Sequence, residues 1–131
     1  MSHSSQQPHR QRILVLNPKG GSGKTTVSTN LAAYLANQGH ATALMDYDPQ
    51  ASSMRWLSKR PDDRPKIFGV EAHKPNVNVT RSWQLRVPPE TRYLVIDSPA
   101  AIAPHQLYDF TRDADARLVP VGKSDIDIHA A

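Results

Sequence analysis

Residues 12–26 read RILVLNPKGGSGKTT, an apolar run that leads directly into a glycine-rich loop. Gly20, Gly21 and Gly23 allow the backbone to wrap with its N–H groups pointing inward. A helix that starts near Lys24 would add the positive end of its dipole to the same place. A phosphate group is the natural ligand of such a loop, so we expect a buried parallel strand, a phosphate-binding loop and a helix, in that order.

The loop departs at one place from the strict pattern G-x-x-x-x-G-K-[ST], because Pro18 stands where the first glycine belongs. We expect this to matter little, since the inner glycines and the Gly-Lys-Thr core make the tightest contacts. Lys24 is expected to reach the β and γ phosphates, and the Thr25 hydroxyl to bind Mg²⁺. The pattern leaves open a plain strand-to-helix turn without a ligand. It also leaves unexplained why a second lysine, Lys19, lies in the loop.

Apolar segments that suit strands alternate with segments that suit helices along the chain. Val27, Leu31 and Leu35 recur at helical spacing, and Gly39 suits a left-handed helix end. This alternation predicts an α/β fold, a parallel sheet flanked by helices. The expected strands are 12–16, 40–46, 66–70, 92–97 and 116–121, and the further expected helices lie within 50–58, around 104–113 and from near 125.

Length and composition favour one domain of modest size, because 131 residues can bury only one working core. Residues 1–11 are polar and are expected to form a disordered tail that precedes a domain over 12–131. The sequence contains no apolar run long enough for an integral membrane segment. The expected location is the cytoplasm. The absence of cysteine excludes disulfides, thiolate metal sites and cysteine nucleophiles.

A basic excess lies in the middle of the chain. Residues 55–92 contain nine Lys and Arg against four Asp and Glu, a surplus of five, whereas the whole chain carries a net charge of +4. Such a segment is either a solvated face or a patch for nucleic acid or another acidic partner. Trp56 and Trp83 fall in the same segment, where each is expected to be a core residue rather than a stacking platform.

Acidic or glycine-rich clusters follow three of the expected strands, at 17–25, 46–50 and 97–99. In a parallel sheet the carboxyl ends of the strands meet at one edge, where ligands bind. We therefore expect Asp46, Asp48 and Asp97 to lie near the phosphate loop. Paired acids at strand ends can also be simple caps, and this alternative stays open for Asp46 and Asp48.

Four segments together resemble the ParA/MinD family of ATPases, whose phosphate loop is a deviant Walker A motif. They are KGGSGKTT (19–26), DYDPQAS (46–52), YLVIDSPA (93–100) and LVPVGKSDIDIHA (118–130). The resemblance runs from about residue 12 to the end and is loose over 60–90. It implies a P-loop NTPase fold of the SIMIBI type that binds ATP and Mg²⁺. The residues it places around the nucleotide are Lys19, Gly20, Gly21, Ser22, Gly23, Lys24, Thr25 and Thr26.

The resemblance also assigns roles, and it explains the second lysine. Lys19 would reach across a homodimer to the phosphates of the partner's ATP, so that two subunits hold two nucleotides face to face. Lys19 and Lys24 would stabilise charge as the γ phosphoryl departs, and Asp48 would orient the attacking water. The implied metal set is Thr25, Asp46 and Asp97.

Within this family the sequence is most similar to small ParA partition ATPases of plasmids and chromosomes. That similarity implies ATP-dependent binding to non-specific DNA, association with the nucleoid, and a centromere-binding, ParB-like partner that stimulates hydrolysis. A MinD-like or orphan ParA ATPase that positions another cargo stays open, as does a nucleotide-binding fragment without turnover; a small-molecule kinase ranks last. Because family members are longer, we expect a sequence truncated at its C-terminus.

Overall fold

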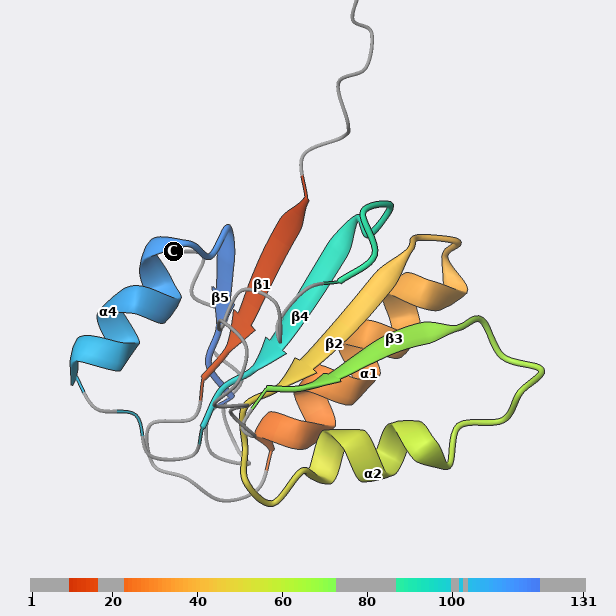
Figure 1. The fold of residues 1–131 in the computed structure, drawn as a ribbon, viewed down its shortest axis with the longest axis horizontal. Helices are drawn as coiled ribbons and strands as arrows, with labels where there is room; N and C mark the ends of the chain where they lie inside the picture. Colours follow the sequence, from red (N-terminus) through yellow and green to blue (C-terminus); the bar gives the residue numbers. More distant parts are fainter. Residues whose placement is uncertain (1–9, 17–22, 73–86, 100–101, 103, 121–131) are drawn as a thin grey trace, which may run out of the picture.

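Within the described residues, five parallel strands form one sheet in the order β3-β2-β4-β1-β5 (Figure 1). The computed structural model describes residues 10–16, 23–72, 87–99, 102 and 104–120. Its strands are β1 (Gln11–Val15), β2 (Thr42–Asp46), β3 (Ile67–Glu71), β4 (Tyr93–Asp97) and β5 (Ala116–Leu118), and its helices are α1 (Lys24–Asn37), α2 (Ser52–Ser58) and α4 (Pro104–Arg112). The predicted α/β architecture of parallel strands flanked by helices is confirmed.

Helix α1 follows the apolar stripe that the sequence predicts. Ala32, Leu35 and Ala36 are buried on the side that faces the sheet. The helix ends as expected at Gly39, whose φ of 90° lies in the left-handed region. The amides of Gly39 and His40 turn back to the carbonyls of Ala36 and Leu35, at 3.0 and 3.2 Å, which is the double hydrogen bond of a Schellman cap.

The alternation of side chains along each strand divides the core into two clusters. Val15, Leu44 and Val95 point toward α1 and α2, where they are fully buried. Leu14, Met45 and Ile96 point the other way, toward α4. Because residues two apart share a face, the last residues of β2 and β4, Asp46 and Asp97, continue the face that α1 covers.

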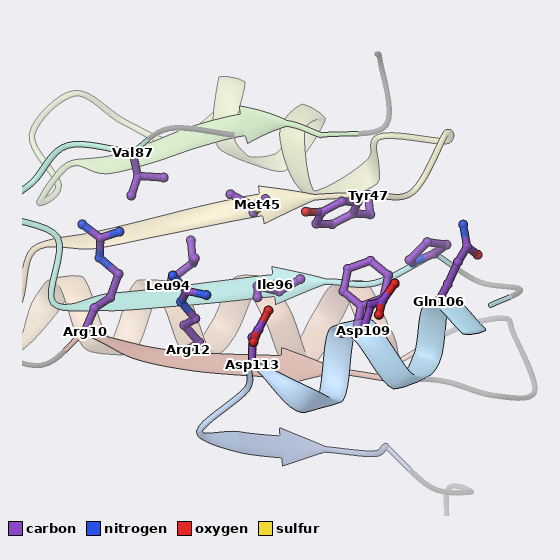
Figure 2. Close-up of a pocket in the computed structure, with 12 residues that line it drawn as sticks. Arg10, Arg12, Met45, Tyr47, Val87, Leu94, Ile96, Gln106, Asp109 and Asp113 are labelled. Carbon is purple, nitrogen blue, oxygen red and sulfur yellow. The ribbon is translucent and has the colours of Figure 1, made fainter. Parts of the chain in front are cut away.

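Figure 2 shows the pocket that lies on the α4 side of the sheet. Helix α4 contributes no buried residue within the described part of the chain, and Phe110 makes an edge-on contact with Tyr47, with 4.8 Å between ring centroids. A cavity of about 490 Å³ lies between this helix and the strands. The apolar floor of this cavity consists of Met45, Leu94 and Ile96. Arg10 and Arg12 lie at one end. The other lining residues are Tyr47, Val87, Pro99, Gln106, Asp109, Phe110 and Asp113.

Each described strand differs from the sequence prediction by one to three residues at an end, and three of these differences have a structural reason. β1 begins at Gln11, inside the predicted tail, and the Arg10 guanidinium donates to the carbonyls of Thr91 and Pro88. β2 begins at Thr42, because the preceding residues complete the cap of α1. β5 ends at Leu118, two residues before Pro120, which has no N–H for a sheet ladder.

The predicted helix from near Asp125 lies outside the described residues. Among the helices that are described, none combines the length and the apolar character that crossing a membrane requires.

Candidate functional site

The register of the sheet brings two of the predicted acids together. Asp46 and Asp97 are direct partners across β2 and β4, and both are fully buried. They lie at the carboxyl ends of their strands, on the face covered by α1, and α1 begins at Lys24. The predicted convergence at one edge of the sheet is therefore present for Asp46, Asp97 and Lys24, whereas loop residues 17–22 lie outside the described residues.

Lys24 lies between two carboxylates. Its side chain is only 3% exposed, and its Nζ forms an ion pair with Asp97 Oδ1 and lies 3.4 Å from Asp48 Oδ2. Asp48 also caps its own turn, since its Oδ1 accepts a hydrogen bond from the Gln50 amide at 3.0 Å. Two acids predicted for the site, Asp97 and Asp48, thus share one buried cation. Such a buried cation needs opposite charges and hydrogen bonds around it, and the two acids supply them.

Asp46 faces the main chain rather than Lys24. Its Oδ1 accepts the Asp48 amide at 2.9 Å, and its Oδ2 accepts the Met54 amide, in the first turn of α2, at 3.3 Å. The capping role that the sequence left open for this residue is therefore present. Burial raises the pKa of Asp46 above its ordinary value of 3.8, and the neighbouring charge of Asp97 acts in the same direction, against the two amides and Lys24.

The start of α1 has a glycine in the left-handed region and no side-chain cap within the described residues. Gly23 has a φ of 111°, a conformation that suits glycine, and its carbonyl accepts the Val27 amide as the first helical hydrogen bond. Within the described chain no side chain caps this helix end. Thr25 is half-buried and Thr26 is exposed. The other loop residues predicted to bind nucleotide, Lys19, Gly20, Gly21 and Ser22, lie outside the described residues.

Two buried serines complete the network, and sequence reasoning assigned a role to neither. Ser53, in the first turn of α2, donates from Oγ to Asp97 Oδ2 at 2.5 Å. Ser98 donates from Oγ to the Val15 carbonyl at 2.7 Å and so joins the ends of β4 and β1. A single buried hydroxyl leaves no periodic pattern in the sequence. The only signal available for these serines was their position beside the acidic motifs.

The donor set fits a phosphate group accompanied by Mg²⁺. No cluster of three or more acids and histidines arranged to hold a metal occurs in the described ranges. Mg²⁺ usually takes one or two carboxylates and completes its shell with water and substrate phosphates. Lys24 and the first turn of α1 offer the cation and the amides that phosphate requires. Thr25 follows Lys24 directly in the sequence, and Asp97 forms an ion pair with Lys24. Both residues therefore lie near Lys24 and the first turn of α1.

The basic segment is partly used for local structure. The Arg55 guanidinium donates to the Gln50 carbonyl and to Ser52, and Arg60 donates to the Pro65 carbonyl and lies 5.6 Å from the ring centre of Trp56. Trp56 is partly buried against the core, as predicted. Trp83 lies outside the described residues. Charges that remain exposed here include Arg64 and Lys66.

Comparison with known proteins also indicates a nucleotide-binding domain. Residues 13–128 match the family model described as the CobQ/CobB/MinD/ParA nucleotide binding domain. A maintenance of carboxysome distribution protein A from Halothiobacillus neapolitanus is 30% identical over 122 residues, which are 91% of this chain and 54% of that protein. The protein of the same name from Gloeobacter kilaueensis is 33% identical over 129 residues, 98% of this chain and 56% of that protein.

A chromosome-partitioning ATPase, Soj, from Thermus thermophilus is 50% identical over a shorter stretch of 50 residues, 38% of this chain and 20% of that protein. The chain spans about half the length of the two carboxysome relatives. Because the family model covers residues 13–128, almost the whole sequence, the chain belongs to the CobQ/CobB/MinD/ParA family of nucleotide-binding domains, as its motifs predicted.

Proposed function

We propose that this chain is a Mg²⁺-dependent ATPase of the ParA type, which dimerises around ATP and drives the partitioning of plasmid or chromosomal DNA. The observation that carries the proposal is the position of Lys24. It begins a helix without a side-chain cap in the described chain, and its buried ammonium lies against Asp97 and Asp48. A phosphate-binding cation beside two carboxylates is the arrangement that phosphoryl transfer with a metal requires.

In ATP hydrolysis, each residue would have a role set by its chemistry. Lys24 exchanges carboxylate partners for phosphate oxygens and stabilises charge that develops on them. Thr25 and Asp97 hold Mg²⁺, which neutralises phosphate charge, while Asp46 acts from further away because its oxygens already accept amides. Asp48 orients water for attack. In the dimer we assign Lys19 to the phosphates held by the other subunit.

The cargo is proposed by analogy with relatives. The similarity to a chromosome-partitioning ATPase supports DNA as the cargo. Non-specific DNA as the surface and a centromere-binding protein as the partner are proposed from the family resemblance of the motifs. A second candidate, positioning of a different large cargo, is favoured by a specific observation. The two relatives that align over more than nine-tenths of the chain are named for carboxysome distribution. Both candidates use the same ATP-dependent switch.

The first experiment tests the switch. The chain is titrated with ATP and Mg²⁺ by calorimetry, hydrolysis is followed by phosphate release, and mass is measured by light scattering. We expect Mg²⁺-dependent ATP binding, slow hydrolysis and a doubling of mass with ATP. Lys24→Ala should abolish all three, whereas Lys66→Ala, which changes an exposed lysine directly before β3, should leave them intact. Binding without hydrolysis would favour the non-hydrolysing alternative, and no binding at all would refute the proposal.

The second experiment separates the cargoes. Retention on non-specific DNA is compared with ATP and with ADP, at low and high salt. Partitioning predicts retention that needs ATP and weakens steeply with salt, because cationic side chains displace counterions from the DNA. ATP hydrolysis without any DNA retention would favour a positioning ATPase that follows another surface. Equal retention with ATP and ADP would contradict a nucleotide switch.

A further inference from the structure

Ser53 connects helix α2 to the carboxylate of Asp97. It is the second residue of the helix, it is fully buried, and its hydroxyl donates to Asp97 Oδ2 at 2.5 Å. A polar side chain at 0% exposure is costly unless it is hydrogen-bonded, and this one has a charged acceptor. The hydroxyl therefore has a partner whose orientation matters for the site.

Asp97 distributes its two oxygens between two different elements. Lys24, from α1, pairs with Oδ1, and Ser53, from α2, donates to Oδ2. A carboxylate at the end of a strand can rotate about its side-chain bonds, but two donors on different oxygens fix its plane. If Lys24 turns toward phosphate, the hydrogen bond from Ser53 is the described side-chain contact that still holds the Asp97 carboxylate.

The same helix start is also joined to the neighbouring strand. The Met54 amide donates to Asp46 Oδ2 at 3.3 Å, and Asp46 Oδ1 accepts the Asp48 amide. The segment from Asp48 to Met54 is therefore attached to the ends of both β2 and β4. A movement of α2 would shift the Ser53 hydroxyl and therefore the Asp97 carboxylate that accepts its hydrogen bond.

We propose that Ser53 is a positioning residue for the magnesium site. Its hydroxyl holds Asp97 Oδ2, so that Oδ1 stays directed toward Lys24 and the phosphate side, and it couples the Asp48 loop and α2 to that carboxylate. The inference rests on the proposed ATPase function and adds a residue that acts on the metal through Asp97. Its specific consequence is that Ser53 governs the affinity for Mg²⁺ and has little influence on metal-free nucleotide binding.

The test compares three variants of the full chain. Ser53→Ala removes the hydroxyl, Ser53→Cys keeps the size with a weak donor, and Ser53→Thr keeps the hydroxyl. Ser28→Ala is the matched control, because Ser28 is equally buried and its hydroxyl has no hydrogen-bond partner in the described structure. Thermal unfolding without nucleotide reports whether each variant is folded.

Two binding measurements give the decisive readout. Binding of a fluorescent ATP analogue is measured in EDTA, and the Mg²⁺ concentration for half-maximal binding is measured by titration. For Ser53→Ala we expect the half-maximal Mg²⁺ concentration to rise by about tenfold, as for other partners of metal ligands, with binding in EDTA within about twofold of the parent chain. Ser53→Cys should give an intermediate shift, Ser53→Thr should restore most of the affinity, and Ser28→Ala should change neither quantity.

Each other outcome overturns the proposal in a recognisable way. An unchanged Mg²⁺ dependence in Ser53→Ala would refute the role of Ser53 alone. Equal losses in EDTA and in Mg²⁺ that the threonine variant does not rescue would show that Ser53 only supports the fold. If Ser53→Ala does not fold, the cysteine variant decides by the same two measurements. A parent chain that ignores ATP and Mg²⁺ would overturn the ATPase function together with this inference.

Discussion

The two faces of the sheet are closed in different ways. On the α1 side, Leu44 and Val95 are fully buried, and the same face ends in the network of Lys24 and the acids. On the α4 side the described helix buries none of its residues, and a cavity of about 490 Å³ remains between helix and strands (Figure 2). Buried charges hold a fixed geometry only where close packing excludes water and limits side-chain rotation. Within the described residues, the network of Lys24 and the acids lies on the face that α1 covers.

The strongest test of this contrast removes the buried cation. Lys24→Met keeps most of the side-chain volume but leaves the Asp97 carboxylate without its positive partner. We expect the free energy of unfolding to fall by about 3 kcal/mol, because breaking a buried ion pair leaves an uncompensated charge. Chemical denaturation at neutral pH measures this difference.

The matched control for the buried pair lies on the other side of the sheet. Arg112, on α4, has an exposed pairing with Asp109 at 3.9 Å, with side chains that are 56% and 65% exposed. Arg112→Ala should change the unfolding free energy by less than about 0.5 kcal/mol. Equal effects of the two substitutions would contradict the distinction between the faces.

The next largest effect concerns apolar packing. Leu44→Ala should lower the free energy of unfolding by about 3 kcal/mol, because Leu44 is fully buried and the tightly packed surroundings cannot collapse into the space it leaves. Phe110→Ala should cost only about 1 kcal/mol, since this ring is half-buried beside an existing cavity. Thermal or denaturant unfolding of both variants gives the comparison. A larger loss for Phe110 would show that the α4 side supports the fold more than its burial indicates.

The sequence predicted helices on both faces of the sheet, since α4, expected around 104–113, spans Pro104–Arg112. Apolar runs, the helical stripe of α1 and Gly39 leave periodic or local signals, so β1, β2, β4 and α1 were placed within one or two residues. The acids at the strand ends were located for the same reason, since a parallel sheet gathers its carboxyl ends at one edge.

The partners within the site were harder to predict. Lys24 has several possible partners, and spacing along the chain does not reveal that Asp97 and Asp48 are the ones it pairs with in the structure. Asp46 carries the same charge as Asp48, but its carboxylate caps main-chain amides because of where α2 begins. Ser53 was missed because a single hydroxyl becomes significant only when the fold buries it against a charge.

A smaller effect follows from the raised pKa of Asp46. A carboxyl group whose pKa rises on folding adds stability below its ordinary value of 3.8, and this contribution is lost as pH increases through the folded value. Relative to Asp46→Asn, the parent chain should therefore lose stability as pH rises from 3.8 upward. Unfolding free energies measured at several pH values give the difference curve. Asp62→Asn, at an exposed acid, is the control; a flat difference for Asp46→Asn would contradict the assigned environment.

The smallest expected effects concern two residues with backbone in the left-handed region, one after α1 and one before α2. Gly39 ends α1 with a φ of 90°, and a Cβ added there would meet no atom within 4 Å, so Gly39→Ala should cost about 1 kcal/mol through backbone conformation alone. Ala51 precedes α2 with a φ of 54°, where a side chain is strained, so Ala51→Gly should be neutral or stabilising by about 0.5 kcal/mol. If denaturant unfolding shows that Gly39→Ala lowers and Ala51→Gly raises the free energy of unfolding, backbone strain is concentrated at Ala51, beside Asp48. Destabilisation by Ala51→Gly would instead mean that the alanine is favoured there by its lower entropy in the unfolded chain.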